Sequence, residues 1–218
     1  MQYQAVVFDM DGVIFDTERL VIEFWKELAK KHNIPNVEHT CIQCLGTNRV
    51  RTREIFLENY GADFPFDPYR AEVTELFNTH YKGVPLPTKP GVRELLSYLQ
   101  EQDIKVGLAS STAQHLVRDE IGTAGLLPYF QTLVCGDMVE HSKPAPDIFL
   151  KACEILNADP TKSIAIEDSF NGIRSAHCAG MTPIMVPDQV QPTDEIRTLA
   201  FHVMPSLLDV LNWLKTLA

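Results

Sequence analysis

The sequence lacks any long apolar run, since no stretch approaches the roughly 18 consecutive apolar residues that a membrane-spanning helix needs. Its first residues, MQYQAVVFDMD, also lack the basic segment and small-residue cleavage site of a secretory leader. We therefore expect a cytoplasmic protein without a membrane partner.

Positive charge is scarce as well. The chain has 19 Lys and Arg residues against 29 Asp and Glu residues, which gives a formal net charge of −10. A surface of this sign repels the phosphate backbone of nucleic acids, so we expect no nucleic-acid partner. A single basic pocket can still bind one anion.

Cysteines are few and do not indicate a disulfide framework. An odd number of them, five, is scattered over 218 residues, which argues against a stapled secreted domain. Cys41 and Cys44 have the C-x-x-C spacing of some redox and zinc sites, but no second Cys/His pair at finger spacing accompanies them. We favour thiols packed on or near a helix, with His39 as an exposed polar residue.

Short apolar runs alternate with longer amphipathic segments, a pattern typical of a parallel sheet flanked by helices. We expect an α/β fold with a Rossmann-like, doubly wound parallel sheet. The predicted strands are residues 5–8, 105–110, 132–136, 163–168, 183–187 and 201–204. The predicted helices are residues 91–102, 113–123, 146–157, 169–179, 193–199 and 206–216.

The region between the first two predicted strands departs from this alternation. Leu20, Phe24, Trp25 and Leu28 have helical spacing, and no convincing strand follows. The segment KGVPLPTKPG at residues 82–91 contains three prolines, which suit a linker. We expect an all-helical domain at 17–84, inserted into an α/β core formed by residues 1–16 and 85–218.

Acidic residues follow the first predicted strand in the segment FDMDG. A parallel strand that ends at Phe8 would bring Asp9 and Asp11 to the ligand-binding edge of the sheet, and Gly12 would let the chain turn away. Two carboxylates held close together call for a cation or a shared proton. An ordinary acidic turn is the alternative interpretation.

Three further segments near predicted strand ends carry matching chemistry. The first segment has hydroxyls before a helix, which can bind an anion. The second has a lysine before prolines, which can bind a phosphate. The third has carboxylates, which suit Mg²⁺. Alone, each has an ordinary explanation as a helix cap, a solvated lysine or charges near a helix start. The residues are Ser110, Ser111 and Thr112 in LASST, Lys143 in SKPAPD, and Glu167 and Asp168 in IEDS.

With these motifs in this order, the sequence resembles the haloacid dehalogenase superfamily, and within it the β-phosphoglucomutases and small sugar-phosphate phosphatases. The resemblance covers essentially the whole chain and implies that the helical insertion is a cap domain. It implies that Asp9 is a nucleophile forming an aspartyl-phosphate and that Asp11 is the general acid/base. It also implies Mg²⁺ held by the Asp9 carboxylate, the Asp11 carbonyl and Asp168, with Glu167 nearby, and a phosphoryl group bound by Ser110, Ser111 and Lys143.

The resemblance also suggests residues that contact the substrate. The segment LGTNR at residues 45–49 matches a cap loop of the relatives, which implies that Arg49 contacts a substrate oxygen or second anion and that Asn48 donates a hydrogen bond. Arg49, Arg51 and Arg53 are equally consistent with a charged helix start. Both interpretations stay open.

The motifs also bear on the reaction. The dehalogenating branch of the superfamily lacks the second acid, so Asp11 favours phosphoryl transfer. In the related mutases a histidine restrains the acid/base residue, and the matching position here is Val21, which cannot form a hydrogen bond. We therefore expect a monomeric, Mg²⁺-dependent phosphatase of small phosphorylated metabolites such as hexose phosphates, with a phosphosugar mutase as the alternative.

Two other classes of protein fit the sequence less well. A receiver module, whose aspartate is phosphorylated for signalling, has no need of a large helical insertion over its site. A protein that keeps the fold without activity is disfavoured because all four motifs are intact.

Overall fold

A six-stranded, wholly parallel sheet forms the centre of the computed structural model, which describes residues 3–45, 47 and 49–217. The strand order is β3-β2-β1-β4-β5-β6, so the chain winds outward from β1 in both directions. This is the predicted doubly wound arrangement. The strands are β1 (Ala5–Phe8), β2 (Lys105–Ser110), β3 (Thr132–Cys135), β4 (Ser163–Glu167), β5 (Thr182–Met185) and β6 (His202–Val203).

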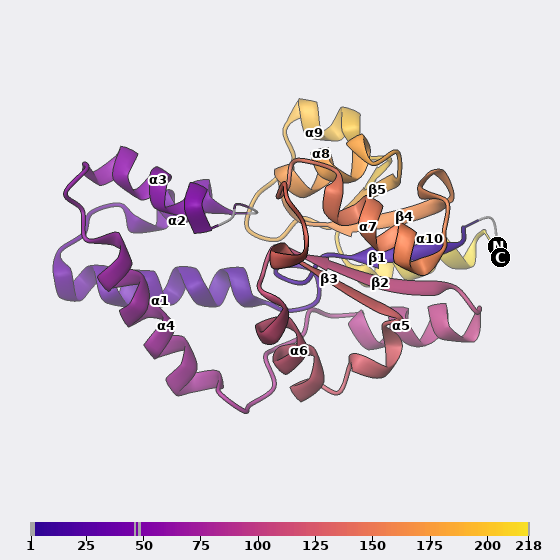
Figure 1. Cartoon of the computed structure of the whole chain (residues 1–218), viewed down its shortest axis with the longest axis horizontal. Coiled ribbons are helices and arrows are strands. Elements are labelled where there is room, and N and C mark those ends of the chain that lie inside the picture. Colours follow the sequence, from indigo (N-terminus) through magenta and orange to yellow (C-terminus); the bar gives the residue numbers. More distant parts are fainter. Residues whose placement is uncertain (1–2, 46, 48, 218) are drawn as a thin grey trace.

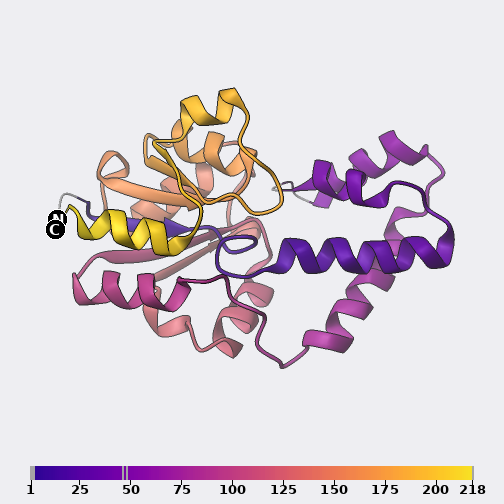
Figure 2. The same ribbon diagram turned by 180° about the vertical axis from the view of Figure 1, so that it is seen from behind.

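Helices cover both faces of the sheet because successive strand residues point to opposite sides. Val6 and Phe8 pack with one set of helices, and Ala5 and Val7 pack with the other. Figure 1 shows α7 and α8 on one face, and Figure 2 shows α5 and α10 on the other. The flanking helices are α5 (Val92–Glu101), α6 (Gln114–Thr123), α7 (Asp147–Leu156), α8 (Phe170–Cys178), α9 (Asp194–Leu199) and α10 (Leu207–Lys215).

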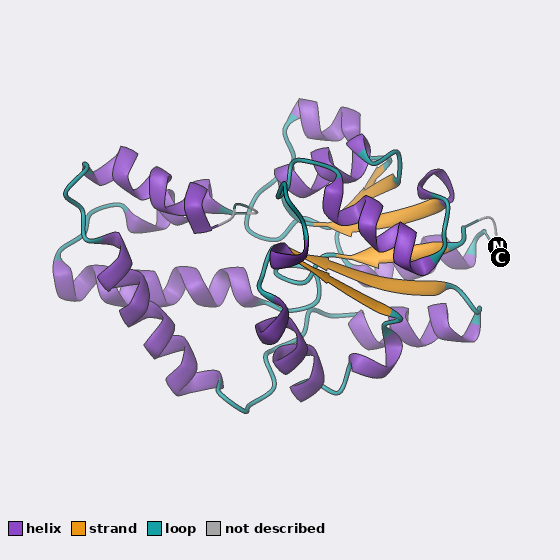
Figure 3. Cartoon of the chain, in the orientation of Figure 1, coloured by secondary structure: helices purple, strands orange, loops and turns teal. Residues whose placement is uncertain are grey.

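Among the described residues, four helices lie between β1 and the proline-containing segment at residues 82–91. They lie at one end of the molecule, away from both termini, and no strand is drawn among them (Figure 3). They pack around their own aromatic cluster, in which the ring centroid of Phe56 lies 4.5 Å from that of Trp25 and 5.1 Å from that of Phe66. We call residues 17–81 the helical insert. Its helices are α1 (Thr17–His32), α2 (Val37–Cys44), α3 (Arg49–Tyr60) and α4 (Phe66–Tyr81).

The sequence of α1 accounts for both its burial and its end. The predicted stripe of Leu20, Phe24, Trp25 and Leu28 is buried against the other helices of the insert. Asn33 ends the helix with a left-handed φ of 55°, a conformation that asparagine tolerates well. The helix therefore presents its apolar side to the insert's core and projects away from the sheet.

Two backbone segments connect the sheet to the helical insert, and they run side by side. The amide of Asp16 donates to the carbonyl of Pro87 at 2.9 Å, and the amide of Lys89 donates to the carbonyl of Ile14 at 2.9 Å. The Lys89 ammonium also binds Asp188 at 2.7 Å. Residues 82–91 hold no helix or strand, as their prolines predict.

The predicted strands and flanking helices agree with the observed ones to within two residues at each end. None of the described helices combines the length and the apolar character that crossing a bilayer requires.

Candidate active site

Buried polar residues gather at the carboxyl edge of the sheet, where the predicted strand-end motifs meet. Phe8 pairs with Leu108 on one side and with Ile166 on the other, so the residues that follow these strands lie at one level. This register places Asp9 beside Glu167. The parallel sheet therefore brings together groups that are more than 150 positions apart in the chain.

Lys143 connects the carboxylates of this edge. Its Nζ donates to Asp9 Oδ1 at 2.5 Å, to Glu167 Oε1 at 2.6 Å and to the Ala109 carbonyl at 2.9 Å. Burial works against the charged ammonium, yet Asp9 and Glu167 raise the pKa of Lys143 above its ordinary value. The lysine is therefore a permanent buried cation next to Asp9.

Glu167 is held from several sides and has no contact with solvent. Besides Lys143, the Ser169 hydroxyl donates to Glu167 Oε2 at 3.1 Å. Gly172 in α8 leaves room for this carboxylate, because a Cβ at that position would lie 1.9 Å from Glu167 Cδ. These contacts hold the Glu167 carboxylate in place beside Lys143.

Asp168 lies directly beneath the turn that follows β1. Gly12 has a φ of +79°, as expected of a glycine that reverses the chain, and a Cβ there would lie 2.2 Å from Asp168 Oδ2. Burial, followed by the charges of Glu167 and Asp9, raises the pKa of Asp168 well above its usual range. The glycine thus permits a close approach that any other residue would prevent.

The donor set at this edge fits a divalent cation. Asp9, Glu167 and Asp168 each offer one oxygen, and these three atoms lie within 4.8 Å of one another. When ionised, the three residues carry three negative charges and Lys143 returns one, which leaves two for a divalent cation to balance. Oxygen ligands of this kind suit Mg²⁺.

The pKa of Asp9 reflects its burial and the charged groups around it. Burial raises its pKa well above the ordinary value, Lys143 opposes the rise, and Glu167 and Asp11 add to it. A carboxylate in this position gains from every added positive charge nearby.

The Asp11 carboxylate points to a different set of partners. Its Oδ1 accepts a hydrogen bond from the Thr17 hydroxyl at 2.6 Å, and its Oδ2 accepts one from the Thr112 hydroxyl at 3.1 Å. Burial raises the pKa of Asp11, and these two bonds partly offset the rise. Thr17 was not among the residues predicted from the sequence, because only its position at the start of a helix marks it there.

The loop after β2 supplies hydroxyls, as predicted. Ser110 is fully buried, and its Oγ accepts a hydrogen bond from the Thr112 amide at 3.1 Å. Ser111 and Thr112 line the cavity described below, whereas the Ser110 hydroxyl is bound within the loop itself. Helix α6 begins two residues later, at Gln114.

A cavity of about 550 Å³ lies between the sheet edge and the helical insert. Asp9, Asp11, Lys143 and Asp168 line it from the sheet side. The insert contributes a wall of apolar and polar groups, and its lining residues include Val21, Trp25, Cys41, Cys44, Arg49, Phe56 and Arg70. Both the sheet edge and the helical insert therefore line the cavity.

Arg49 reaches this cavity and also takes part in the charged surface of the insert. It is the first residue of α3, and its Nη2 donates to Asp67 Oδ1 at 3.2 Å. Arg51 pairs with Glu58 on the helix surface, which agrees with a charged helix start, and contact of Arg49 with a substrate stays a prediction. The predicted contact of Asn48 lies outside the described residues.

The Cys41 and Cys44 thiols are free, as favoured from the sequence. Both lie in α2, where burial raises the pKa of Cys44 to about 12 and raises that of Cys41 further still. Thiols that stay protonated are poor nucleophiles and poor metal ligands.

A doubly wound parallel sheet whose carboxyl edge carries buried acids and a buried lysine beneath a helical insert defines an α/β enzyme. Comparison with known proteins identifies the family to which this enzyme belongs. The family model described as haloacid dehalogenase-like hydrolase matches residues 6–186, and the chain belongs to this family.

Two named enzymes are similar to this chain over more than four fifths of their length. The chain is 33% identical to the phosphorylated carbohydrates phosphatase of Thermotoga maritima over 181 residues, which covers 83% of each protein. It is 34% identical to the beta-phosphoglucomutase of Bacillus subtilis strain 168, over 87% of this chain and 85% of that protein. The crystal structure of beta-phosphoglucomutase from Clostridium difficile shares the fold, with a TM-score of 0.80 at 24% identity over 98% of this chain and 96% of the other.

Proposed function

We propose that this protein is a phosphatase that hydrolyses small phosphorylated metabolites, in particular sugar phosphates, through an aspartyl-phosphate on Asp9. The observation that carries the proposal is the buried Asp9, held at 2.5 Å by Lys143 in a cavity that Asp11 also lines. The similarity to a phosphatase of phosphorylated carbohydrates supports the substrate class.

A carboxylate that attacks a phosphate monoester must overcome the repulsion between two anions. Lys143 supplies one fixed positive charge beside Asp9. The loop of Ser111 and Thr112 supplies polar groups on the same cavity wall. Because these groups are already in place, they lower the cost of charge that builds up on the phosphoryl oxygens in the transition state.

We propose that Mg²⁺ is held by the carboxylates of Asp9 and Asp168 and the backbone carbonyl of Asp11, with Glu167 close by. When bound, the ion neutralises negative charge on the phosphoryl group and on its attacking carboxylate. Since Glu167 already binds Lys143 and Ser169, we assign it chiefly to positioning the lysine.

Asp11 serves as the acid and then as the base. Its raised pKa favours the protonated form, which can give its proton to the leaving oxygen as the Asp9 carboxylate forms the new P–O bond and the old one breaks. The same group then accepts a proton from the water that attacks phosphorus. Asp9 leaves as a carboxylate, and inorganic phosphate is released.

We propose that residues 17–84 act as a cap over an α/β core of residues 1–16 and 85–218. The insert has its own aromatic cluster and contributes about half of the cavity wall, so it can admit and enclose a substrate. Arg49, together with Asn48, would contact the part of the substrate that the cap encloses.

Removal of divalent metal is expected to abolish phosphate release. Without the ion, Asp9 and Asp168 face each other with only Lys143 to offset them, and both would bind protons more readily. Dialysis against a chelator, followed by addition of Mg²⁺, should first stop and then restore hydrolysis of a sugar phosphate. Mg²⁺ should also raise the melting temperature, because it binds the folded state, and Asp168→Asn should weaken this effect. Undiminished activity in excess chelator would rule out the requirement.

A phosphosugar mutase is the second candidate. It is supported by the similarity to a beta-phosphoglucomutase and by the two threonine hydroxyls that hold the Asp11 carboxylate. Against it stands Val21, which lines the cavity with a side chain unable to form a hydrogen bond. We therefore favour hydrolysis.

One experiment distinguishes hydrolysis of the phosphate from its transfer within the sugar. The protein and Mg²⁺ are mixed with β-glucose 1-phosphate and a trace of the 1,6-bisphosphate, and free phosphate and glucose 6-phosphate are followed together. We expect phosphate release from hexose phosphates without isomerisation, because nothing at Val21 restrains Asp11. Glucose 6-phosphate that forms faster than phosphate is released would reverse the assignment to a mutase.

A further inference from the structure

Arg70 in α4 is a cation that lacks the carboxylate partner its neighbours have. Arg49 Nη2 donates to Asp67 Oδ1 at 3.2 Å, and Arg53 Nε donates to Asp67 Oδ2 at 3.1 Å, so both oxygens of Asp67 are engaged. Within the described ranges, 3–45, 47 and 49–217, no hydrogen bond or ion pair engages the Arg70 guanidinium. It differs in this respect from Arg51, which binds Glu58 at 2.8 Å.

The surroundings of Arg70 leave its charge poorly compensated. The side chain is half-buried. Burial lowers the pKa of Arg70, the neighbouring charge of Arg49 lowers it further, and Asp67 opposes both effects. A half-buried guanidinium in this position would gain from an anion that the protein itself does not provide.

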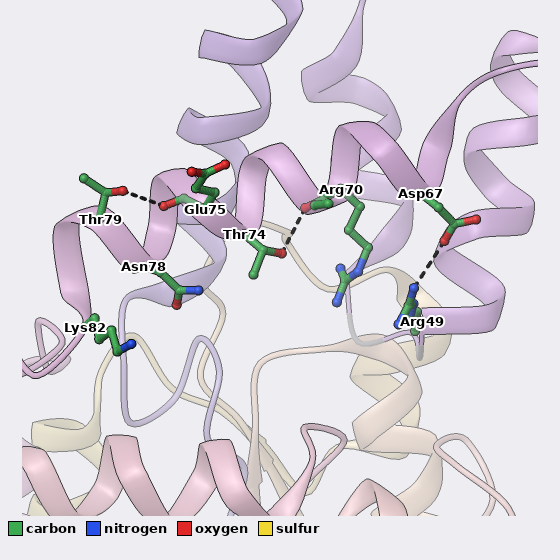
Figure 4. Close-up of a pocket in the computed structure, with 9 residues that line it drawn as sticks. Arg49, Asp67, Arg70, Thr74, Glu75, Asn78, Thr79 and Lys82 are labelled. Atoms are coloured by element: carbon green, nitrogen blue, oxygen red, sulfur yellow. Dashed lines mark hydrogen bonds and ion pairs between the residues drawn. The ribbon is translucent and has the colours of Figure 1, made fainter.

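Arg70 lies where two cavities meet. It lines the cavity that contains Asp9 and Lys143, and it also lines a second cavity of about 640 Å³ along α4. Thr74 and Asn78 follow Arg70 at intervals of four residues and so form one stripe on α4, and Lys82 lies just past the end of the helix. Figure 4 shows the side chains of Arg70, Thr74 and Asn78 extending from the same side of α4, with Lys82 beyond the end of the helix.

The positions of two cations, Lys143 and Arg70, indicate which kind of substrate the protein can bind. At the catalytic end, Lys143 already serves the phosphoryl group that is to be transferred. Arg70 stands on the opposite wall, on the insert, where the leaving part of the substrate would lie. A guanidinium presents a planar set of N–H donors that matches a carboxylate or a phosphate with two parallel bonds.

We propose that Arg70 determines specificity by binding a second anionic group, a carboxylate or a second phosphate, on the leaving part of the substrate. The inference rests on the proposed phosphatase function and narrows its substrate class to phosphorylated metabolites with a second negative group. Lys82, an exposed cation just past the end of α4 that lines the second cavity, adds to the attraction for such substrates.

The test compares kcat/KM for four substrates in the wild type, in Arg70→Gln and in the control Arg53→Gln. The substrates are glucose 1,6-bisphosphate, 6-phosphogluconate, glucose 6-phosphate and p-nitrophenyl phosphate. Arg53 is a suitable control because it is exposed, binds Asp67 as Arg49 does, and lines neither cavity. Both variants should melt within a few degrees of the wild type, as surface substitutions usually do.

We expect the wild type to prefer the bisphosphate or the phosphorylated acid over glucose 6-phosphate. Arg70→Gln should lower kcat/KM for the preferred substrate by about tenfold or more, mainly through KM, since a charge-assisted hydrogen bond is lost. The same variant should change hydrolysis of glucose 6-phosphate and p-nitrophenyl phosphate by no more than about twofold. The kcat/KM values of Arg53→Gln should equal those of the wild type for all four substrates. The two anionic substrates distinguish a phosphate from a carboxylate as the second group.

Three results would overturn the inference: equal losses on every substrate, no preference for a second anion in the wild type, or the same losses in Arg53→Gln. Each of these presupposes that p-nitrophenyl phosphate is hydrolysed. If no phosphate is released from any of the four substrates, the proposed function itself is wrong.

Discussion

Replacing Asp9 by asparagine is expected to abolish phosphate release and leave the fold intact. An amide is not a nucleophile, so no covalent phosphoryl intermediate can form at this position. The fall in kcat should be roughly thousandfold or more, as in other enzymes that lose their nucleophile. The measurement is phosphate release from a sugar phosphate in the presence of Mg²⁺.

The fold should survive because the amide has nearly the shape of the carboxylate, and its oxygen can still accept a hydrogen bond from Lys143. The change also removes one of three crowded negative charges. Asp103→Asn is a matched control: Asp103 is exposed and has a φ of 54°, which asparagine tolerates. An Asp9→Asn variant with activity within about tenfold of the wild type would refute the nucleophilic role.

Replacing Lys143 by methionine should destabilise the protein as well as inactivate it. The ammonium binds Asp9 and Glu167, and all three groups are buried. Removing one partner of a buried ion pair leaves an uncompensated charge, at a cost of about 3–5 kcal/mol. We expect a fall of that order in the free energy of unfolding, measured by urea denaturation in the presence of chelator.

The pH dependence of this loss identifies its cause. Lys143 lowers the pKa of Asp9, so its removal shifts that pKa further upward, and the folded variant binds protons more readily than the unfolded chain. Stability then rises as the pH falls through the raised pKa. The free energy of unfolding of Lys143→Met should therefore fall further below the wild-type value at neutral pH than at about pH 5.5.

A suitable control is Lys162→Met, since Lys162 is exposed on the same α/β core. The free energy of unfolding of this variant should lie within about 0.5 kcal/mol of the wild-type value. A loss in Lys143→Met that does not change with pH would mean that the lysine contributes packing rather than charge.

Much of the fold follows from local patterns in the sequence. A run such as Val6, Val7 and Phe8 is apolar on both sides, and this suits a strand that is buried between two layers of helices. Helix α1 has a single apolar stripe, which suits one buried face. Boundaries were predicted well because prolines, glycines and asparagine residues mark many of them.

The candidate site was predictable to the extent that its residues follow strands. Asp9, Glu167 and Asp168 come directly after apolar runs, and parallel strands end at one edge, so their proximity follows from the fold class. The partners of these residues were not predictable. Nothing near Thr17 in the sequence indicates that its hydroxyl binds Asp11.

The order and type of the elements, the parallel sheet, and the edge at which the acidic groups gather follow from the sequence, because they depend on periodicity and on residues close together in the chain. The folded structure was needed to show that Lys143 binds Glu167, 24 positions away, and that Asp67 pairs with Arg49 and Arg53 but not with Arg70. Such pairings depend on how loops and helices pack and on where each side chain then points. Local sequence does not encode that geometry.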